Sequence, residues 1–333
     1  MNVEVSATQA AATLRVKSKL ENGVIRPPTN LELIVSDHCN ISCRQCNHAS
    51  PVMRKWNATA EDAERDLQCL TGIYRAKYLR LIGGEPVLNP HLADIIRVAA
   101  KADVAEKLIL VTNGILLDRL SDDVFAMLDE VEVSHYPNVG LKDAAIEAIR
   151  LRGARLGTGV RVAKYPEFRY SFSSQLLRDE QLVEKIWRGC RIANIWGCHA
   201  VYKGKIYRCP QSIYASGVRQ NACDSKDGLA LNQGADFQQI LLDFLNSSSP
   251  LDACRNCMGT NGKKFSHEIV IRKGWSGDLD QPPEEMIDYE LLETSLAGMS
   301  EIDDCRVVIR EGKWSRSRFA TRLRRIKTRF ASR

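Results

Sequence analysis

Blocks of apolar and polar residues alternate between residues 31 and 165, and their period changes regularly from strand type to helix type. Apolar runs of strand character cover residues 31–39, 77–86, 106–114, 131–137 and 154–165. Helical periodicity covers the intervening residues 59–76, 91–102, 121–130 and 141–153. Thr59 is placed to cap the first of these helices and Gly153 to end the last. A strand–helix unit repeated with short connections predicts an α/β fold with a parallel sheet.

The pattern changes on both sides of this core, which spans residues 31–165. Residues 1–30 are a polar leader, with one short helix expected, that ends at the "RPPTN" break. Across residues 166–270 cysteines and turn residues become frequent, which predicts a linker helix and a small second module. Residues 271–333 form a C-terminal extension.

The positive charge of the chain is concentrated at its C-terminus. The net charge is +6, and residues 306–333 hold eleven Lys or Arg and one acid, so the tail carries +10 and the remainder −4. Apolar residues recur at helical spacing within the tail at Trp314, Phe319, Leu323, Ile326 and Phe330. Such a basic amphipathic helix either packs on the body or makes peripheral contact with an anionic membrane surface. The body has no basic patch, so nucleic acid is not an expected partner.

The sequence contains eleven cysteines, and their interpretation depends on the compartment in which the protein is expected. The sequence has no apolar run of about 18 residues and no basic start followed by an apolar core, so neither a membrane span nor a secretory signal is expected. We therefore expect a cytoplasmic protein, in which thiols stay reduced. Cysteines in such a protein are better interpreted as metal or cluster ligands than as disulfides.

Three cysteines follow the first predicted strand within eight residues, at Cys39, Cys43 and Cys46. Positions i, i+4 and i+7 share a helix face, so a buried apolar stripe is one interpretation, although the intervening residues are polar. A zinc site is a second, with His38 or His48 as the fourth ligand. The third is an iron–sulfur cluster held by three thiolates, with one iron left open for chemistry.

This spacing, at the end of the first strand of a strand–helix series, resembles the radical S-adenosylmethionine (SAM) enzymes. The resemblance covers residues 31–165 and implies a partial (β/α) barrel of parallel strands. It also implies that Cys39, Cys43 and Cys46 hold a [4Fe–4S] cluster whose fourth iron is chelated by SAM. In the family the residue before the third cysteine is often aromatic, and here it is Gln45, which leaves open what packs on the adenine side.

Further motifs of the resemblance follow at the later strand ends. Gly83, Gly84 and Glu85 of "GGEP" match the turn that binds the SAM amino group, and Glu85 could add a charge-assisted partner. Asn113 of "TNG" and Ser134 match positions that contact the SAM carboxylate and ribose. His135, Tyr136 and Arg161 would also lie near this site if the strands are parallel.

A second group of cysteines lies beyond the core, at Cys190, Cys198, Cys209, Cys254 and Cys257. The segment "CHAVYKGKIYRCP" predicts a hairpin that turns at residues 203–204, which places Cys198 opposite Cys209. Cys254 and Cys257 form a Cys-x2-Cys pair. By chemistry alone, zinc is the expected metal for four such thiols.

The pattern also resembles the SPASM and shorter twitch extensions of radical SAM enzymes, which carry auxiliary [4Fe–4S] clusters. The resemblance implies one auxiliary cluster and therefore two clusters in all. Cys209, Cys254 and Cys257 fit it directly, whereas Cys198 and Cys190 remain alternatives for the fourth ligand.

The resemblance also sets the expected function. The chain would cleave SAM reductively and abstract hydrogen from a carbohydrate-like small molecule or glycan, as an oxidoreductase or epimerase, with flavodoxin or ferredoxin as electron donor. One alternative is a peptide-modifying maturase. Another, of a different class, is a non-catalytic metal-binding protein on the same fold.

Overall fold

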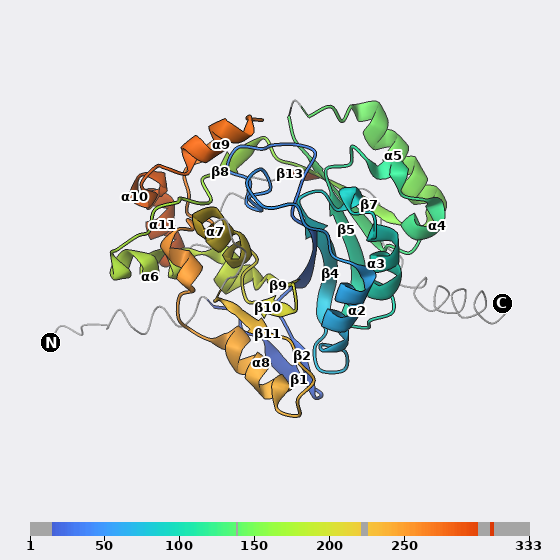
Figure 1. The fold of residues 1–333 in the computed structure, drawn as a ribbon, viewed down its shortest axis with the longest axis horizontal. Coiled ribbons are helices and arrows are strands. Elements are labelled where there is room, and N and C mark those ends of the chain that lie inside the picture. Colours follow the sequence, from blue (N-terminus) through green and yellow to red (C-terminus); the bar gives the residue numbers. More distant parts are fainter. Residues whose placement is uncertain (1–14, 138, 221–225, 299–306, 310–333) are drawn as a thin grey trace.

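A mostly parallel sheet of nine strands runs through the centre of the computed structural model, which describes residues 15–137, 139–220, 226–298 and 307–309 (Figure 1). Within that part of the chain the strand order is β11-β10-β9-β3-β4-β5-β6-β7-β13. The pairs from β9 to β7 are parallel, and the outer pairs are antiparallel. The strands are β3 (Asn30–Ser36), β4 (Ala76–Gly83), β5 (Ala105–Thr112), β6 (Glu130–His135), β7 (Gly159–Lys164), β9 (His199–Tyr202), β10 (Lys205–Tyr207), β11 (Gly228–Ala230) and β13 (Val307–Ile309). The predicted α/β fold with a parallel sheet is confirmed.

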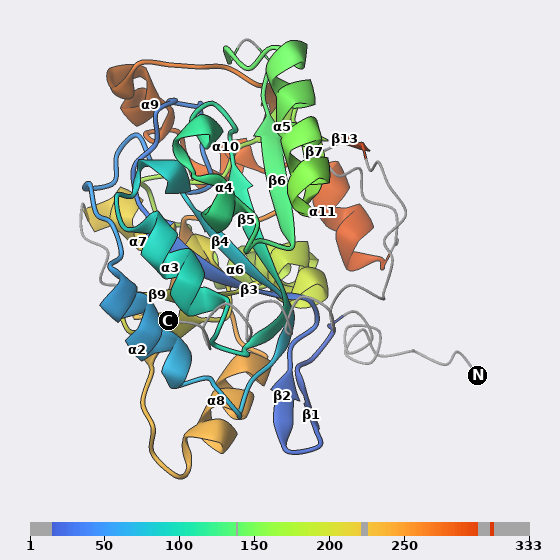
Figure 2. The ribbon, with the colours of Figure 1, turned by 90° about the vertical axis from the view of Figure 1, so that its right-hand side faces the viewer.

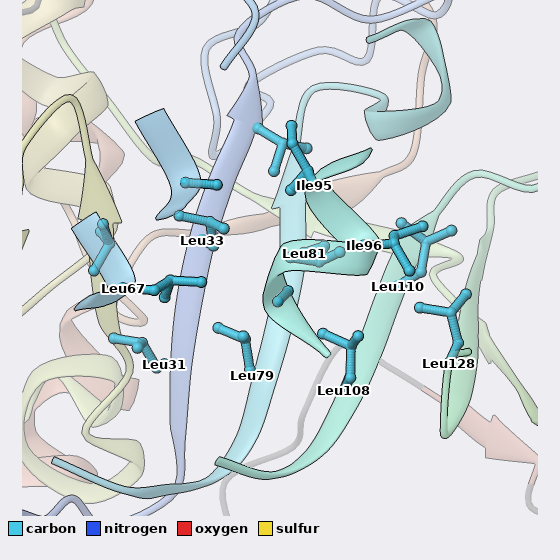
Figure 3. Packing of buried hydrophobic residues seen from close by; sticks show 14 of the residues in the cluster. Leu31, Leu33, Leu67, Leu79, Leu81, Ile95, Ile96, Leu108, Leu110 and Leu128 are labelled. Atoms are coloured by element: carbon cyan, nitrogen blue, oxygen red, sulfur yellow. The ribbon is translucent and has the colours of Figure 1, made fainter. Parts of the chain in front are cut away.

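Leucines on alternate strand positions attach the first four helices to one face of the sheet. Leu79 and Leu81 of β4 face this layer together with Leu108 and Leu110 of β5 (Figure 3). The helices are α2 (Ala60–Gln68), α3 (Leu92–Ala99), α4 (Asp122–Phe125) and α5 (Asp143–Leu156). Because strand side chains alternate, the residues between these leucines point to the opposite, inner face of the sheet.

Local signals explain where two of the helices begin and end. Thr59 caps α2 as predicted, since its hydroxyl accepts a hydrogen bond from Asp62 N and its own N–H donates to the Asp62 side chain, each at 3.1 Å. The prediction that Gly153 ends the fourth helix was wrong, because α5 continues to Gly157, which has φ +76°. Gly153 instead permits close packing on β7, where a Cβ would lie 2.5 Å from Val160 Cγ2.

The N-terminal region departs from the predicted leader. Its described part contains a hairpin, β1 (Lys19–Glu21) with β2 (Val24–Arg26), and no helix. Asn22 and Gly23 both have positive φ, at 52° and 76°, which is the type I′ arrangement that an Asn-Gly turn favours. The expected helix in this region is therefore not found among residues 15–30, and residues 1–14 lie outside the described chain.

The predicted hairpin near residue 203 is confirmed, but it does not belong to a separate module. Tyr202 pairs with Lys205, as expected for a turn at residues 203–204. However, β9 also pairs in parallel with β3, with Leu31 opposite His199, so the hairpin extends the main sheet. The predicted boundary at residue 166 is therefore not a boundary of the sheet.

The later helices other than α8 lie on the other side of the sheet. Figure 1 shows α6, α7, α9, α10 and α11 on the side opposite α2–α5, and Figure 2 shows α8 at the end that carries the β1–β2 hairpin. Gln238 joins α8 to that hairpin by donating to Gly23 O at 2.7 Å. The bounds are α6 (Glu180–Gly189), α7 (Gln211–Gln220), α8 (Phe237–Asn246), α9 (Arg272–Asp278), α10 (Pro283–Met286) and α11 (Tyr289–Leu296). None of the described helices has the length and apolar character needed to cross a membrane. Residues 310–333, which include the predicted basic amphipathic helix, lie outside the described residues.

Candidate functional site

The carboxyl ends of β3, β4, β5 and β6 meet at one edge of the sheet and bring together the sequence motifs that follow them. Ser36 and Gly83 end the first two of these strands and are paired to each other. Thr112 and Ser134 occupy the corresponding ends of β5 and β6. The cysteine loop that follows Ser36 lies at this edge, as the sequence predicted.

The thiols of Cys39, Cys43 and Cys46 are mutual neighbours in a mostly buried environment. Burial raises the pKa of Cys39 to about 12, with a smaller contribution from charge on Cys46. Burial likewise raises the pKa of Cys43, and charges on Cys46 and Cys39 add to this effect. Three thiolates here would repel one another in a medium of low dielectric, so a bound positive centre would stabilise them.

The chemistry of the donors suits an iron–sulfur cluster, because thiolates are the ligands that hold such clusters. In a [4Fe–4S] cluster each thiolate binds its own iron, so the sulfurs need not converge on one point. Cys46 is also surrounded by backbone donors, since hydrogen bonds from His48 and Ser50 oppose the burial that raises its pKa. The three thiols therefore fit a cluster.

Gly83 and Gly84 allow the end of β4 to contact the backbone that precedes the cysteines. Gly84 N donates to Ser36 O at 2.7 Å. A Cβ at Gly84 would lie 2.2 Å from His38 O, and one at Gly83 would lie 2.1 Å from Ser36 O. These glycines are thus required for the junction between β4 and the cysteine loop.

Glu85 joins two of the predicted SAM motifs and is itself fully buried. Its carboxylate accepts hydrogen bonds from Thr112 Oγ1 at 2.7 Å, Asn113 N at 2.8 Å and Val87 N at 3.0 Å. Burial raises the pKa of Glu85, and these bonds oppose that shift. The expectation that Glu85 adds a charge-assisted partner for SAM stays a prediction, and the contacts seen here join neighbouring loops.

Asn113 connects the end of β5 to the cysteine loop. Its Nδ2 donates to Asn40 Oδ1 at 2.7 Å and lies 3.7 Å from Cys39 Sγ. Ser134, 7% exposed, lies near the end of β6 and hydrogen bonds to the Tyr136 side chain. The structure thus brings the predicted SAM-facing positions to one rim.

Gln45 has a role that the sequence did not reveal. It is 1% exposed, and its Oε1 accepts hydrogen bonds from Ser171 N at 3.0 Å and Phe172 N at 3.1 Å. Its Nε2 donates to Phe172 O at 3.3 Å. The amide therefore attaches the cysteine loop to a segment more than a hundred residues away, and no pattern of spacing could predict that contact.

A C-terminal segment packs along the cysteine loop. Ile269 forms a β-bridge with Cys43, whose carbonyl also accepts from Trp275 Nε1 at 2.8 Å. Arg44 binds Asp278 through two hydrogen bonds, at 2.5 and 3.1 Å. His267 Nε2 lies 3.2 Å from Cys43 Sγ. A pocket of about 400 Å³ beside this contact is lined in part by His267 and Ile269.

Four of the five remaining candidate cysteines form a second group. Burial raises the pKa of Cys209, and charges on Cys190, Cys257 and Cys254 raise it further. Burial also raises the pKa of Cys254 to about 12, again with a contribution from Cys190. Gly259 supplies both space and a donor, because a Cβ there would lie 2.6 Å from Cys190 Sγ and its N–H lies 3.4 Å from Cys257 Sγ.

Cys198 lies in different surroundings. Its thiol donates to Asn30 Oδ1 at 3.6 Å, and its pKa is raised to about 12 by burial and then by Glu32. The charge of Arg80 opposes this rise in the pKa of Cys198. Cys190 is the one cysteine whose charge contributes to the rise. The hairpin register predicts Cys198 opposite Cys209, whereas the hydrogen bond of the Cys198 thiol is to Asn30.

The inner face of the sheet carries a network of charges below the rim. Arg80 Nη2 lies 2.8 Å from Glu132 Oε2, and Arg80 Nη1 lies 3.7 Å from Glu32 Oε1. Arg161 binds Glu130 at 2.7 Å and also contacts Glu132. The side chains of Arg80 and Arg161 keep 18% and 17% of their surface exposed, so neither is sealed from solvent.

Part of the chain is similar to known proteins. Residues 33–161 match the model of the Radical SAM superfamily. The chain is 34% identical over 109 residues to a GTP 3',8-cyclase of Rhodopirellula baltica and 33% identical over 113 residues to a probable GTP 3',8-cyclase of Pyrococcus horikoshii. These matches cover 32% and 33% of this chain and 30% and 34% of the relatives, so the chain spans about a third of their length.

Two solved structures are also similar. BtrN in complex with AdoMet and 2-DOIA is 14% identical, with a TM-score of 0.36, and the match covers 68% of this chain and 83% of that one. Streptococcus suis SuiB bound to S-adenosylmethionine is 18% identical, with a TM-score of 0.33, and the match covers 42% of this chain and 34% of that one.

Proposed function

We propose that this chain, whose residues 33–161 match the model of the Radical SAM superfamily, applies radical SAM chemistry to a hydroxyl-rich, carbohydrate-like small molecule or glycan. The cofactors of the superfamily are a [4Fe–4S] cluster and SAM. When bound, they supply one-electron chemistry, in which reductive cleavage of SAM yields a 5′-deoxyadenosyl radical that abstracts hydrogen from the substrate. The reaction proposed here is dehydrogenation or epimerisation.

One observation carries the proposal: the group of three neighbouring thiols, of Cys39, Cys43 and Cys46, at the rim where the strand ends meet. Cys39, Cys43 and Cys46 would hold the cluster. The positions for SAM are Gly83, Gly84, Asn113 and Ser134, with Glu85 holding the loops that carry them. The protein's own contribution is to position these groups and exclude water.

The inner-face charges support a hydroxylated substrate. The group contains two guanidiniums, of Arg80 and Arg161, and three carboxylates, of Glu32, Glu130 and Glu132. If all are ionised, +2 and −3 sum to −1. Alternating donors and acceptors suit the hydroxyl and amino groups of such a substrate. Hydrogen bonds to charged side chains are also stronger than those between neutral groups.

Conversion of GTP is the second candidate, favoured by the identity to GTP 3',8-cyclases. A nucleoside triphosphate brings several negative charges, and the inner-face group has no net positive charge to receive them. The match also covers only about a third of those relatives. A carbohydrate-like substrate is therefore preferred.

We further propose an auxiliary [4Fe–4S] cluster held by Cys190, Cys209, Cys254 and Cys257. Charges on Cys190, Cys254 and Cys257 raise the pKa of Cys209. The N–H of Gly259 donates a hydrogen bond to Cys257 Sγ. Hydrogen bonds of this kind to cluster sulfurs are common and adjust the reduction potential. This cluster would accept an electron from the substrate radical or bind substrate.

The deciding experiment is anaerobic reconstitution with iron and sulfide, followed by SAM and a strong reductant. The proposal expects about eight irons per chain and formation of 5′-deoxyadenosine. Replacing Cys39, Cys43 and Cys46 together by Ala should remove about half the iron and all nucleoside, whereas the control Cys69→Ala should change neither.

Substrate class is tested with deuterated candidates. Transfer of deuterium to 5′-deoxyadenosine from an aminocyclitol or sugar, and not from GTP, would support the proposal. Transfer from GTP alone would establish the cyclase-like alternative. Tightly held zinc, or iron without SAM cleavage, would contradict the enzyme proposal and indicate a metal-stabilised binding protein.

A further inference from the structure

His267 presents a ring nitrogen to the sulfur of Cys43. The distance from His267 Nε2 to Cys43 Sγ is 3.2 Å, and His267 is only 6% exposed. The ring stacks on Tyr136 with 5.0 Å between centroids and 15° between planes. It also meets the edge of Phe168 at 4.8 Å and 67°. The two aromatic contacts prevent the ring from turning away from the thiol.

The backbone next to the ring is paired with the cysteine loop, which fixes the distance further. Arg44 N donates to Glu268 O at 2.9 Å, and Val270 N donates to Ser42 O at 2.9 Å. Ser42 and Arg44 flank Cys43 in the chain. The position of the imidazole relative to this one sulfur is therefore set by main-chain bonds as well as by side-chain packing.

The direction of the hydrogen bond follows from the chemistry of the ligand. A thiolate bound to iron has no hydrogen to donate and can only accept. The bond therefore requires the hydrogen on Nε2 of His267. A donor at the sulfur stabilises the added negative charge of the reduced cluster more than the oxidised form, which raises the reduction potential.

We propose that His267 is a positioning residue that donates an N–H···S hydrogen bond to Cys43 and raises the reduction potential of the SAM-binding cluster. This inference rests on the proposed cluster at Cys39, Cys43 and Cys46. Neither the family match, which ends at residue 161, nor the spacing of the cysteines assigns a function to this histidine.

The test compares His267→Phe, which keeps a ring between the aromatic neighbours but has no N–H, with His267→Gln, which keeps an amide donor. The exposed His91, replaced by Gln, serves as the matched control. The midpoint potential is measured by redox titration followed by electron paramagnetic resonance, using the signal that changes when SAM is added. The signal that does not respond to SAM is an internal reference.

The inference expects a more negative potential in His267→Phe, an intermediate one in His267→Gln, and no shift in His91→Gln or in the reference signal. An unchanged potential in a His267→Phe protein with full iron would overturn it. If His267→Phe takes up no iron, the test is pulsed electron paramagnetic resonance on protein labelled with ¹⁵N-histidine. A nitrogen coupling present in the wild type and absent from His267→Gln supports the bond, and identical spectra overturn it. A wild-type protein without any SAM-responsive cluster would instead refute the proposed function.

Discussion

Gln45 is hydrogen bonded to the backbone of Phe172 through both ends of its side-chain amide, with Oε1 accepting at 3.1 Å and Nε2 donating at 3.3 Å. Phe172 forms a β-bridge in turn with Cys257, one of the second group of cysteines. A short path of main-chain and amide bonds therefore joins the loop of the first cysteine group to the second. The position before the third cysteine serves to connect the two candidate cluster sites.

Replacing Gln45 by Leu should destabilise the protein, because two buried backbone N–H groups, of Ser171 and Phe172, would lose their acceptor. Leaving such groups unsatisfied costs about 2–4 kcal/mol for the pair. The denaturant midpoint of the reconstituted protein measures this loss. Gln239→Leu, at an exposed position on α8, is the control. Equal midpoints for the two variants would show that the connection contributes nothing.

Arg44 and Asp278 should be energetically coupled, because their guanidinium and carboxylate form two hydrogen bonds with side chains only 22% and 15% exposed. A double-mutant cycle to Ala is expected to give about 1 kcal/mol of coupling in the free energy of unfolding. The pair Arg255–Glu180, also bound through two hydrogen bonds but more exposed, is the matched comparison and should couple less strongly. If the exposed pair couples as strongly, burial does not strengthen the contact between the cysteine loop and α9.

The sequence was informative wherever local pattern decides structure. Alternation of apolar residues located the strands β3 to β7, and Thr59 marked the start of α2. The spacing of Cys39, Cys43 and Cys46 located the first group of thiols, since residues so close in the chain stay close in the fold. Asn22 and Gly23 likewise form a local turn signal, since an Asn-Gly pair favours the positive φ values found there.

Contacts between distant segments could not be predicted in the same way. Gln45, His267 and Trp275 matter because of what the fold places beside them, more than a hundred residues away in the chain. Hairpin counting likewise gave Cys198 a facing partner, but it could not show that β9 also pairs with β3. The register of the hairpin was predictable, but its second partner strand lies far away in the chain.

Glu85→Gln should weaken both folding and SAM binding. An amide keeps one acceptor oxygen but directs its NH₂ group at a donor, either Asn113 N or the Thr112 and Val87 pair. The expected loss in the free energy of unfolding is about 1–3 kcal/mol. Denaturant unfolding checks this value, and calorimetric titration with SAM checks the affinity.

The control for this change is Glu64→Gln, at an exposed position on α2. A Glu85→Gln protein with wild-type stability but no SAM affinity would contradict the role argued here. It would show that Glu85 contacts SAM directly rather than holding the loops together.

Cys190 and Cys198 should behave differently when each is replaced by Ala. The thiol of Cys190 raises the pKa of Cys209, Cys254 and Cys257, whereas Cys198 contacts Asn30. Cys190→Ala should therefore lose about half of the reconstituted iron, since one of two clusters loses a ligand. Cys198→Ala should keep all of it. Iron and sulfide analysis under anaerobic conditions measures both, with Cys69→Ala as the control for loss of a thiol.

The reverse result, with iron lost on replacing Cys198 and kept on replacing Cys190, would mean that the hairpin register decides the ligand set. In that case Cys198 would have to leave its contact with Asn30, and β9 would shift relative to β3 when the cluster binds. Iron kept in both variants would show that neither cysteine alone is required. If the double variant also kept its iron, the auxiliary group would hold its cluster with three protein thiolates and an open iron, as proposed for the first group.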